Sequence, residues 1–196
     1  MSTNEAALFI KHIRARVDFS DLEIEKILYE AEIITFKKGD FVCKQNETHQ
    51  RSNYILSGAL KTFHTDKDGI EHVVAFGIED WWAGDVASFI SQRPADFAVQ
   101  CLEESIIITF SYEKMHQLFE DVPPFERFYR LLIQKAYVHA QKRVISNFSL
   151  SAKERYKIFI EKYPQLLQRY PQYLIASYLG ITKEFLSKLR KEIAQE

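Results

Sequence analysis

The spacing of apolar residues changes twice along the chain, near residues 112 and 149. Between Ile33 and Ser111, short runs of β-branched and aromatic residues are separated by turn-forming residues, which is typical of antiparallel strands. Residues 124–148 contain no glycine, and apolar residues recur every three or four positions, which predicts one long helix. Residues 149–196 repeat the helical spacing in shorter segments and predict an all-helical third part.

The strand region predicts a compact antiparallel roll or barrel. Five of the six glycines lie between residues 39 and 84, where they separate the apolar runs. The turn Lys67–Gly69 joins two such runs and predicts a β-hairpin. Before the strands, Ser20–Glu23 has the signature of a capping box, so we expect a short helix from there to about Ala31.

The long helix carries two apolar stripes, and a helix with two apolar faces has to bury both. The first stripe comprises Phe125, Tyr129, Leu132, Ala136, Ala140 and Val144, and the second comprises Phe128, Leu131, Val138 and Ile145. One face can pack on the roll and the other against a second copy, which predicts a homodimer. The alternative is the central helix of a monomeric core. We favour the homodimer, because a long helix between two domains has few partners within its own chain.

The C-terminal part contains the most specific local pattern, a helix-turn-helix at residues 172–191. Ala176 allows a close helix approach, Gly180 tolerates the positive φ of the turn, and Thr182 can cap the second helix. The inward positions are apolar: Ile175, Leu179, Ile181, Leu186 and Leu189. A second capping box at Ser151–Glu154 opens a preceding helix. A plain helical hairpin that caps another core has the same pattern and is the alternative.

Charge separates the C-terminal part from the rest, although the formal net charge is only −1. Residues 1–110 carry 11 basic and 18 acidic side chains, whereas residues 149–196 carry 9 basic and 5 acidic ones. A basic module on an acidic body is typical of a DNA-binding module attached to a sensor or scaffold.

Several classes of protein are disfavoured by composition. There is no apolar stretch of about eighteen residues or more, and the N-terminus lacks the basic-then-apolar order of a signal peptide. Cys43 and Cys101 are too few and too isolated for a disulfide framework or a zinc site. We therefore expect a cytoplasmic protein with no membrane partner.

An N-terminal β-roll, a long central helix and a C-terminal helix-turn-helix together resemble the Crp–Fnr family of bacterial transcription factors. The most specific segments are residues 54–72, the pair Gly84-Asp85 and residues 176–191. The resemblance implies an α+β chain whose antiparallel roll, a double-stranded β-helix or jelly-roll type, resembles a cyclic-nucleotide-binding domain. The implied domains are a sensor roll with N-terminal helices at 1–112, a hinge and dimerisation helix at 113–148, and a DNA-binding domain at 149–196. The implied partners are double-stranded DNA, a second copy, RNA polymerase and a small-molecule effector.

The segment in which nucleotide-binding members hold the cyclic phosphate departs from their pattern. Asp85 replaces a glutamate of longer reach, and Ala95-Asp96 replaces an Arg-Ser or Arg-Thr pair. Because a carboxylate there repels phosphate, we expect no cyclic nucleotide and no other cofactor, and an effector of unknown identity. Nearby aromatic residues suit an apolar or planar ligand or fill the interior of the roll. The candidate effector pocket comprises Trp82, Gly84, Asp85, Ser88, Arg93, Phe97, Ala140 and Gln141.

Matching to the family motif assigns roles to the second helix of the helix-turn-helix. Lys183, Glu184 and Lys188 are expected to contact bases, because lysine donates to guanine and glutamate accepts from cytosine. Thr182, Ser187 and Lys191 are placed for phosphates. A homodimer then reads a pseudo-palindrome with half-sites about one helical turn apart. We expect little or no wing, because only a few residues follow this helix.

A cupin-like metalloenzyme is the rival interpretation, because that fold is also a small β-barrel. Of the six histidines, only His64 and His72, with Glu71, form a candidate ligand cluster. Exposed strand histidines give the same pattern, and no nucleophile–base arrangement is visible, so we expect no metal site and no enzyme. A dimeric ligand-binding module without DNA binding is the third alternative.

Overall fold

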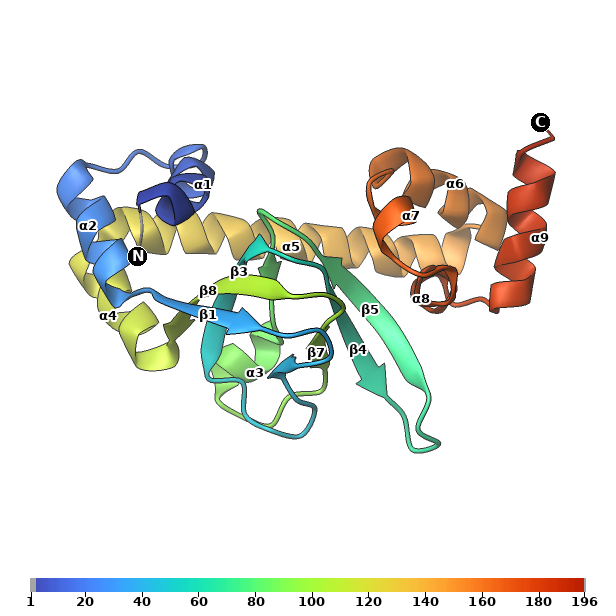
Figure 1. Cartoon of the computed structure of the whole chain (residues 1–196), viewed down its shortest axis with the longest axis horizontal. Helices are drawn as coiled ribbons and strands as arrows, with labels where there is room; N and C mark the ends of the chain where they lie inside the picture. Colours follow the sequence, from blue (N-terminus) through green and yellow to red (C-terminus); the bar gives the residue numbers. More distant parts are fainter. Residues whose placement is uncertain (1–2, 196) are drawn as a thin grey trace.

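Two four-stranded antiparallel sheets form a β-roll in the middle of the molecule (Figure 1). The computed structural model describes residues 3–195. One sheet has the order β1-β8-β3-β6 and the other β2-β7-β4-β5. The strands are β1 (Glu32–Phe36), β2 (Phe41–Cys43), β3 (Arg51–Ser57), β4 (Leu60–Thr65), β5 (Glu71–Gly77), β6 (Trp82–Ala83), β7 (Ala98–Cys101) and β8 (Ser105–Ser111). The predicted antiparallel roll is confirmed.

The predicted hairpin joins β4 and β5, and Leu60 pairs with Gly77 at one end of it. Gly69 in its turn has a φ of +81°, the left-handed region that glycine adopts without strain. Between the two sheets lies an apolar core formed by Cys43, Ile55, Leu60, Ala95, Val99, Cys101 and Ile107. The hairpin has a buried apolar face, and its second strand, β5, is an edge strand of its sheet.

The helices with predicted capping residues begin close to the predicted positions. The helices are α1 (Thr3–Arg14), α2 (Asp21–Glu30), α3 (Val86–Ser91), α4 (Tyr112–Asp121), α5 (Pro123–Ser149), α6 (Ala152–Lys162), α7 (Leu166–Arg169), α8 (Gln172–Leu179) and α9 (Lys183–Ile193). Ser20 and Ser151 form complete capping boxes with Glu23 and Glu154, which confirms both predictions. The short helix α7 lies in a segment whose apolar pattern gave no prediction.

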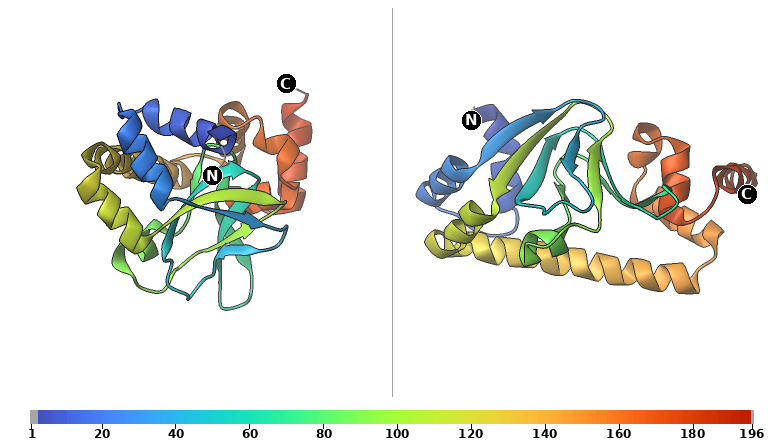
Figure 2. Two further views of the ribbon diagram at one scale, coloured as in Figure 1. Left: turned by 60° about the vertical axis from the view of Figure 1, so that its left-hand side comes forward. Right: turned by 90° about the horizontal axis from the view of Figure 1, so that it is seen from below.

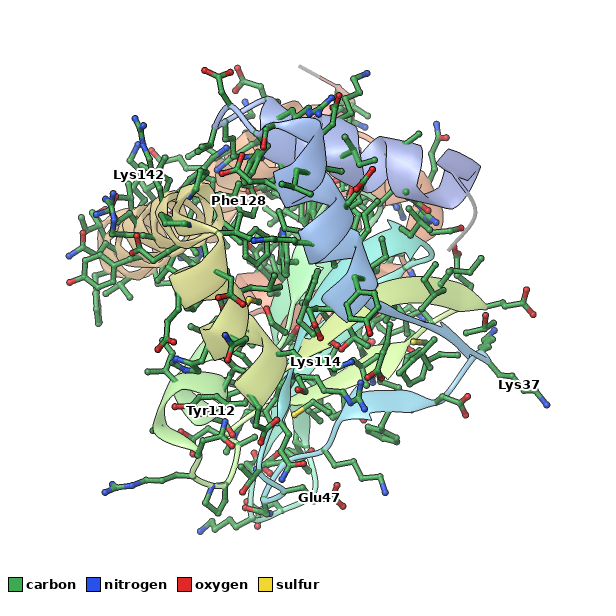
Figure 3. The ribbon with its side chains drawn as sticks, turned by 90° about the vertical axis from the view of Figure 1, so that its left-hand side faces the viewer. Lys37, Glu47, Tyr112, Lys114, Phe128 and Lys142 are labelled. Carbon is green, nitrogen blue, oxygen red and sulfur yellow. The ribbon has the colours of Figure 1, made fainter. Side chains whose placement is uncertain are left out.

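The 27-residue helix α5 runs along one side of the roll and connects two groups of helices (Figures 1 and 2). α1, α2 and α4 lie at one end, and α6 to α9 lie at the other. At the first end, Phe125 and Phe128 of α5 are buried against Phe9, Ile13 and Phe110. In Figure 3, α5 is seen nearly end-on, with Phe128 on its inner side and Lys142 on its outer side.

Burial on α5 divides along its length and not between the two predicted stripes, because Ala136, Ala140 and Val144 of the first stripe are exposed and Leu131 of the second packs against the core. Phe125, Tyr129 and Leu132 of the first stripe pack into the core beside the roll. In the second stripe Phe128 is buried, whereas Val138 and Ile145 are exposed. No helix in residues 3–195 is long and apolar enough to cross a membrane. Nor does any strand follow β8 in that part of the chain, so a wing beside α9 is not seen there.

Candidate functional site

α8 and α9 meet at a short turn whose geometry agrees with the sequence pattern. Gly180 has a φ of +68°, and its N–H donates to the carbonyl oxygens of Ala176 and Ser177 at the end of α8. The Thr182 hydroxyl accepts a hydrogen bond from the N–H of Phe185 and caps α9. The inward residues Ile175, Leu179, Leu186 and Leu189 are buried, and Ile181 is half-buried.

α9 presents an exposed polar face opposite its buried leucines. All six residues expected to contact DNA are exposed: Thr182, Lys183, Glu184, Ser187, Lys188 and Lys191. Arg190 is exposed beside them and was missing from the prediction, although its position three residues after Ser187 places it near the same face. α9 lies at the outer end of the molecule, away from the N-terminal helices (Figure 1).

The C-terminal helices pack directly on β5 of their own chain through an aromatic cluster. The ring centre of Phe76 lies 4.3 Å from that of Tyr170, 5.2 Å from that of Tyr178 and 6.3 Å from that of Phe159. The buried hydroxyl of Tyr170 donates to the carbonyl oxygen of Gly77 at 2.6 Å. One apolar cluster therefore extends from the sheet into α6 and α8.

Arg169, the last residue of α7, links this helical group to the roll through two carboxylates. Its guanidinium donates to both carboxylate oxygens of Glu79, at 2.5 and 2.7 Å, and to Glu103 at 2.5 Å. The Glu79 carboxylate also accepts from the N–H of Gly58 at 2.8 Å. The guanidinium hydrogen bonds hold the pKa of Glu79 at about 2, against an ordinary value of 4.5, and the two carboxylates raise the pKa of Arg169.

Two further side chains bind the backbone of β5. The Ser177 hydroxyl of α8 accepts from the N–H of Val73 at 3.0 Å and donates to the carbonyl oxygen of Glu71 at 3.1 Å. Arg143 of α5 donates to the carbonyl oxygen of Val74, and its guanidinium lies 4.4 Å from the ring centre of Tyr178. These contacts occupy groups that an edge strand leaves unpaired, and they position α8 relative to the roll.

The loop that resembles a phosphate-binding segment is closed by its own carboxylate. Asp85 is buried and caps α3, and one of its oxygens accepts from the N–H of Ser88 at 2.9 Å. The other oxygen accepts from the N–H groups of Asp96 and Phe97 at 2.9 and 3.2 Å. The donors that could receive an anion in this loop are therefore already bound within the chain.

A cavity of about 470 Å³ lies between the roll, α1, α5 and the end of α6. Its lining residues include His12, Arg16, His49, Asp80, Trp81, Trp82, Gly84, Asp85, Tyr129, Leu132, Lys135, Ala136, His139, Lys162 and Tyr163. A volume of this size is typical of small-molecule sites. Burial lowers the pKa of His12 and of His49 in its wall, so neither imidazole readily gains a charge.

The structure brings together only some of the predicted pocket residues. Trp82, Gly84 and Asp85 line the cavity. The other five predicted residues, Ser88, Arg93, Phe97, Ala140 and Gln141, do not. Ser88 is buried behind the loop, where its hydroxyl donates to the carbonyl oxygen of Arg93, and Ala140 and Gln141 are exposed on α5.

Sequence reasoning missed the basic part of the cavity wall, which comes from α5, from the end of α6 and from Arg16 after α1. Lys135 and His139 lie four residues apart on α5, on the face that also carries Leu132. Because residues at this spacing share one face of a helix, the sequence contained a signal for these two residues. Lys162 and Tyr163 come from the end of α6, and nothing in their local pattern points to the roll.

The candidate metal-binding histidines do not form a ligand cluster. His64 and His72 face each other across β4 and β5, but His72 lies 2.7 Å from a carboxylate oxygen of Asp66 and His64 lies 2.8 Å from the carbonyl oxygen of Asp96. Within residues 3–195, no group of three histidine, cysteine, aspartate or glutamate side chains is arranged to hold a metal ion.

The roll of two antiparallel sheets, with its capped loop at Asp85, is similar to cyclic-nucleotide-binding domains. The family described as Cyclic nucleotide-binding domain matches residues 33–122, from β1 to the end of α4. The transcriptional activator protein anr of Pseudomonas aeruginosa is 23% identical over 164 residues, which cover 78% of this chain and 66% of that protein. The match therefore spans less than two thirds of the length of this curated relative.

Two solved structures share the fold over most of the chain. FixK2 from Bradyrhizobium japonicum superposes with a TM-score of 0.73 at 15% identity, covering 84% of this chain and 85% of that one. The c-di-GMP-responsive regulator CLP of Xanthomonas campestris gives 0.70 at 16% identity, with 90% and 92% covered. The family match and these relatives confirm the predicted resemblance to the Crp–Fnr regulators.

Proposed function

We propose that this protein is a homodimeric transcriptional regulator of the Crp–Fnr type that binds a pseudo-palindromic operator through α9. The exposed polar face of α9 carries the proposal, because four cations, Lys183, Lys188, Arg190 and Lys191, lie on a helix whose opposite face is buried. Such a helix can enter the major groove without losing its packing in the protein. The transcriptional relatives support the same function.

Within α9 we assign different roles to individual side chains. Lys183, Glu184 and Lys188 lie near the N-terminal end of the helix and are proposed to contact base edges. The hydroxyls of Thr182 and Ser187 and the ammonium of Lys191 are proposed to contact phosphates. Base contacts determine sequence preference, whereas phosphate contacts determine affinity and its dependence on salt.

The second copy is proposed to pack on the outer face of α5. Leu131, Gln134, Val138, Gln141, Ile145 and Phe148 follow a heptad spacing of three and four residues. Phe148 is 88% exposed and Ile145 is 63% exposed, although both are large and apolar. The face that lines the cavity, with Leu132 and Ala136, lies on the other side of the helix, so one α5 can serve the roll and a partner at once.

The effector is proposed to act through the roll, and RNA polymerase is proposed as the protein partner at a promoter. Asp85 fills the loop that resembles a phosphate-binding segment, which supports the expectation that cyclic nucleotide is not the effector.

Selection of bound DNA from a random pool tests the proposed function directly. Glu184→Ala should relax base preference at one position of each half-site and leave nonspecific binding nearly unchanged. Lys191→Ala should weaken binding to all sequences and reduce the salt slope by about 0.9 per lost phosphate contact. Lys26→Ala, at an exposed position of α2, serves as the charge-matched control. Failure to enrich any palindrome contradicts the function, and equal changes in specificity for both variants contradict the division of roles.

Light scattering tests the homodimer separately. Ile145→Asp places a charge in the proposed seam and should give a monomer, because two carboxylates would meet across the interface. Asn147→Asp adds the same charge to an exposed position outside the heptad seam and should remain dimeric. A dimeric Ile145→Asp variant would show that α5 does not form the interface.

A further inference from the structure

Cations from three separate segments of the chain lie around one cavity. Arg16 follows α1, Lys135 lies on α5 and Lys162 ends α6. Arg16 donates to the carbonyl oxygen of His12 at 2.8 Å, whereas neither Lys135 nor Lys162 has a hydrogen bond or ion pair to another side chain within residues 3–195. The Lys162 ammonium instead lies 5.1 Å from the ring centre of Tyr163. The cavity wall therefore holds positive charge that the chain itself does not pair.

The two carboxylates in the same wall, Asp80 and Asp85, have hydrogen-bond partners other than these cations. Asp80 accepts from the His12 imidazole at 2.5 Å and from the Tyr54 hydroxyl at 3.0 Å. Asp85 is saturated by backbone N–H groups of its own loop. Arg51, which also lines the cavity, is paired with Glu32 at 2.7 Å. The unpaired cations are consequently available for a ligand.

Aromatic rings form the apolar part of the cavity. Trp82 packs edge-on against Tyr129 with ring centres 6.2 Å apart, and Trp81 packs edge-on against Tyr163 at 5.7 Å. Leu132 adds an aliphatic surface from α5. Such walls suit a planar ring, because its faces and edges can pack against the indole and phenol groups.

We propose that this cavity binds a small ligand that carries an aromatic ring and an anionic oxygen group, either carboxylate or phosphate. The ring packs against Trp81, Trp82 and Tyr129, and the anionic group is held by Lys135 and Lys162, with Arg16 at the border. The proposal rests on the proposed function in one respect, that the occupant is the effector. A ligand held this way contacts the roll, α5 and the C-terminal helical group at the same time.

The electrostatics of His139 agree with an anion site. Burial and the neighbouring charges of Lys162 and Lys135 lower the pKa of this imidazole. An anion bound among these groups favours the charged imidazolium, so its arrival raises the pKa of His139. That rise can be followed by NMR titration of the imidazole.

Tryptophan fluorescence reports on this cavity alone, because both tryptophans of the chain lie in its wall. We would titrate the full chain with benzoate and phenyl phosphate as anionic probes and benzyl alcohol as the neutral probe. The expected result is a saturable change with at least one anionic probe and binding at least tenfold weaker for benzyl alcohol. The tighter anionic probe then identifies the group as carboxylate or phosphate.

Charge-removing variants test the assignment of the cations. Lys162→Gln should weaken the anionic probe on the order of tenfold, which corresponds to one charge-assisted hydrogen bond, and leave benzyl alcohol unchanged. Lys135→Gln should act similarly, with its oligomeric state checked by light scattering because this residue flanks the α5 seam. Lys26→Gln should bind as the unmodified protein does.

Two outcomes would overturn the proposal. One is equal affinity for benzyl alcohol and both anions, and the other is anion binding that neither lysine variant weakens. Because no DNA is present, a failure here is separate from a failure of the proposed function. Saturable anion binding in a protein that enriches no DNA would support the ligand class and reject the regulator.

Discussion

Replacing Arg169 by methionine removes a polar link between the C-terminal helices and the roll. The guanidinium makes three hydrogen bonds of 2.5 to 2.7 Å to Glu79 and Glu103. Methionine keeps much of the aliphatic stem but leaves two carboxylates facing each other without a cation. We therefore expect a less stable protein in which the C-terminal helices separate from β5 more easily.

The magnitude follows from the pKa of Glu79, which falls from 4.5 to about 2 mainly through this guanidinium. At about 1.4 kcal/mol per pH unit, the upper limit is about 3 kcal/mol. The Glu79 side chain is 35% exposed, so solvent screening reduces this value, and we expect a loss of about 1.5 kcal/mol. Because the folded-state pKa is lowered, the contribution is present above pH 4.5 and is lost as the pH falls toward about 2.

Urea unfolding between pH 7 and pH 3 measures both effects, and a double-mutant cycle with Glu79→Gln isolates the pair. The unmodified protein should lose more stability below pH 4.5 than Arg169→Met does. Arg14→Met is the control, because the Arg14–Asp21 pair is equally short at 2.6 Å but lies at the surface, and its loss should cost less than about 0.5 kcal/mol. A coupling energy below about 0.5 kcal/mol for Arg169 and Glu79, or parallel pH profiles, would refute the reasoning.

Three further substitutions probe single contacts, each read from the free energy of unfolding. Gly58→Ala should cost about 3 kcal/mol, because Gly58 has a φ of +122° and the new Cβ would lie 2.8 Å from the Cα of Ser105. The control Gly69→Ala, with a φ of +81° in open space, should cost about 1 kcal/mol. Similar losses of stability in the two variants would contradict the argument. Tyr170→Phe should cost about 1 kcal/mol, because the hydroxyl bound to the carbonyl oxygen of Gly77 is buried. The same substitution should speed hydrogen exchange at the end of β5. Unchanged exchange there would count against a role of Tyr170 in docking the C-terminal helices. Asp85→Asn should cost about 2 kcal/mol, because an amide cannot satisfy all three N–H groups that the Asp85 carboxylate accepts from. Asp40 is exposed and its carboxylate accepts from one N–H, so Asp40→Asn should cost less than half as much. Equal losses of stability would refute this reasoning.

Elements with local signals were predicted accurately. The capping boxes at Ser20 and Ser151 join residues three positions apart, and Gly180 sits where the turn requires a positive φ. The hairpin at Lys67–Gly69 is likewise determined by adjacent residues. Such interactions depend on spacing along the chain, which the sequence displays directly.

The docking of the C-terminal helices and the basic wall of the cavity could not be predicted in this way. Arg169 and Glu79 are 90 positions apart, and Ser177 and Val73 are 104 positions apart. Ser177 carries no pattern that distinguishes an exposed hydroxyl from one bonded to a distant strand. The candidate effector pocket was predicted from residues 82–97 of the roll and from Ala140 and Gln141 of the long helix, whereas the cavity depends on where Lys162 is placed by that docking.

The contacts between α8 and the edge of β5 have a geometric consequence for operators. In the proposed homodimer, each α9 is held through the contacts of α8 with β5. The position of the β4–β5 hairpin therefore helps to set the distance between the two proposed DNA-contacting helices. Loosening that connection at Ser177 should leave affinity for one half-site intact while broadening the range of half-site separations that the dimer accepts. Operator spacing would then depend on β5, a strand of the roll that lies outside the proposed DNA-contacting helix α9.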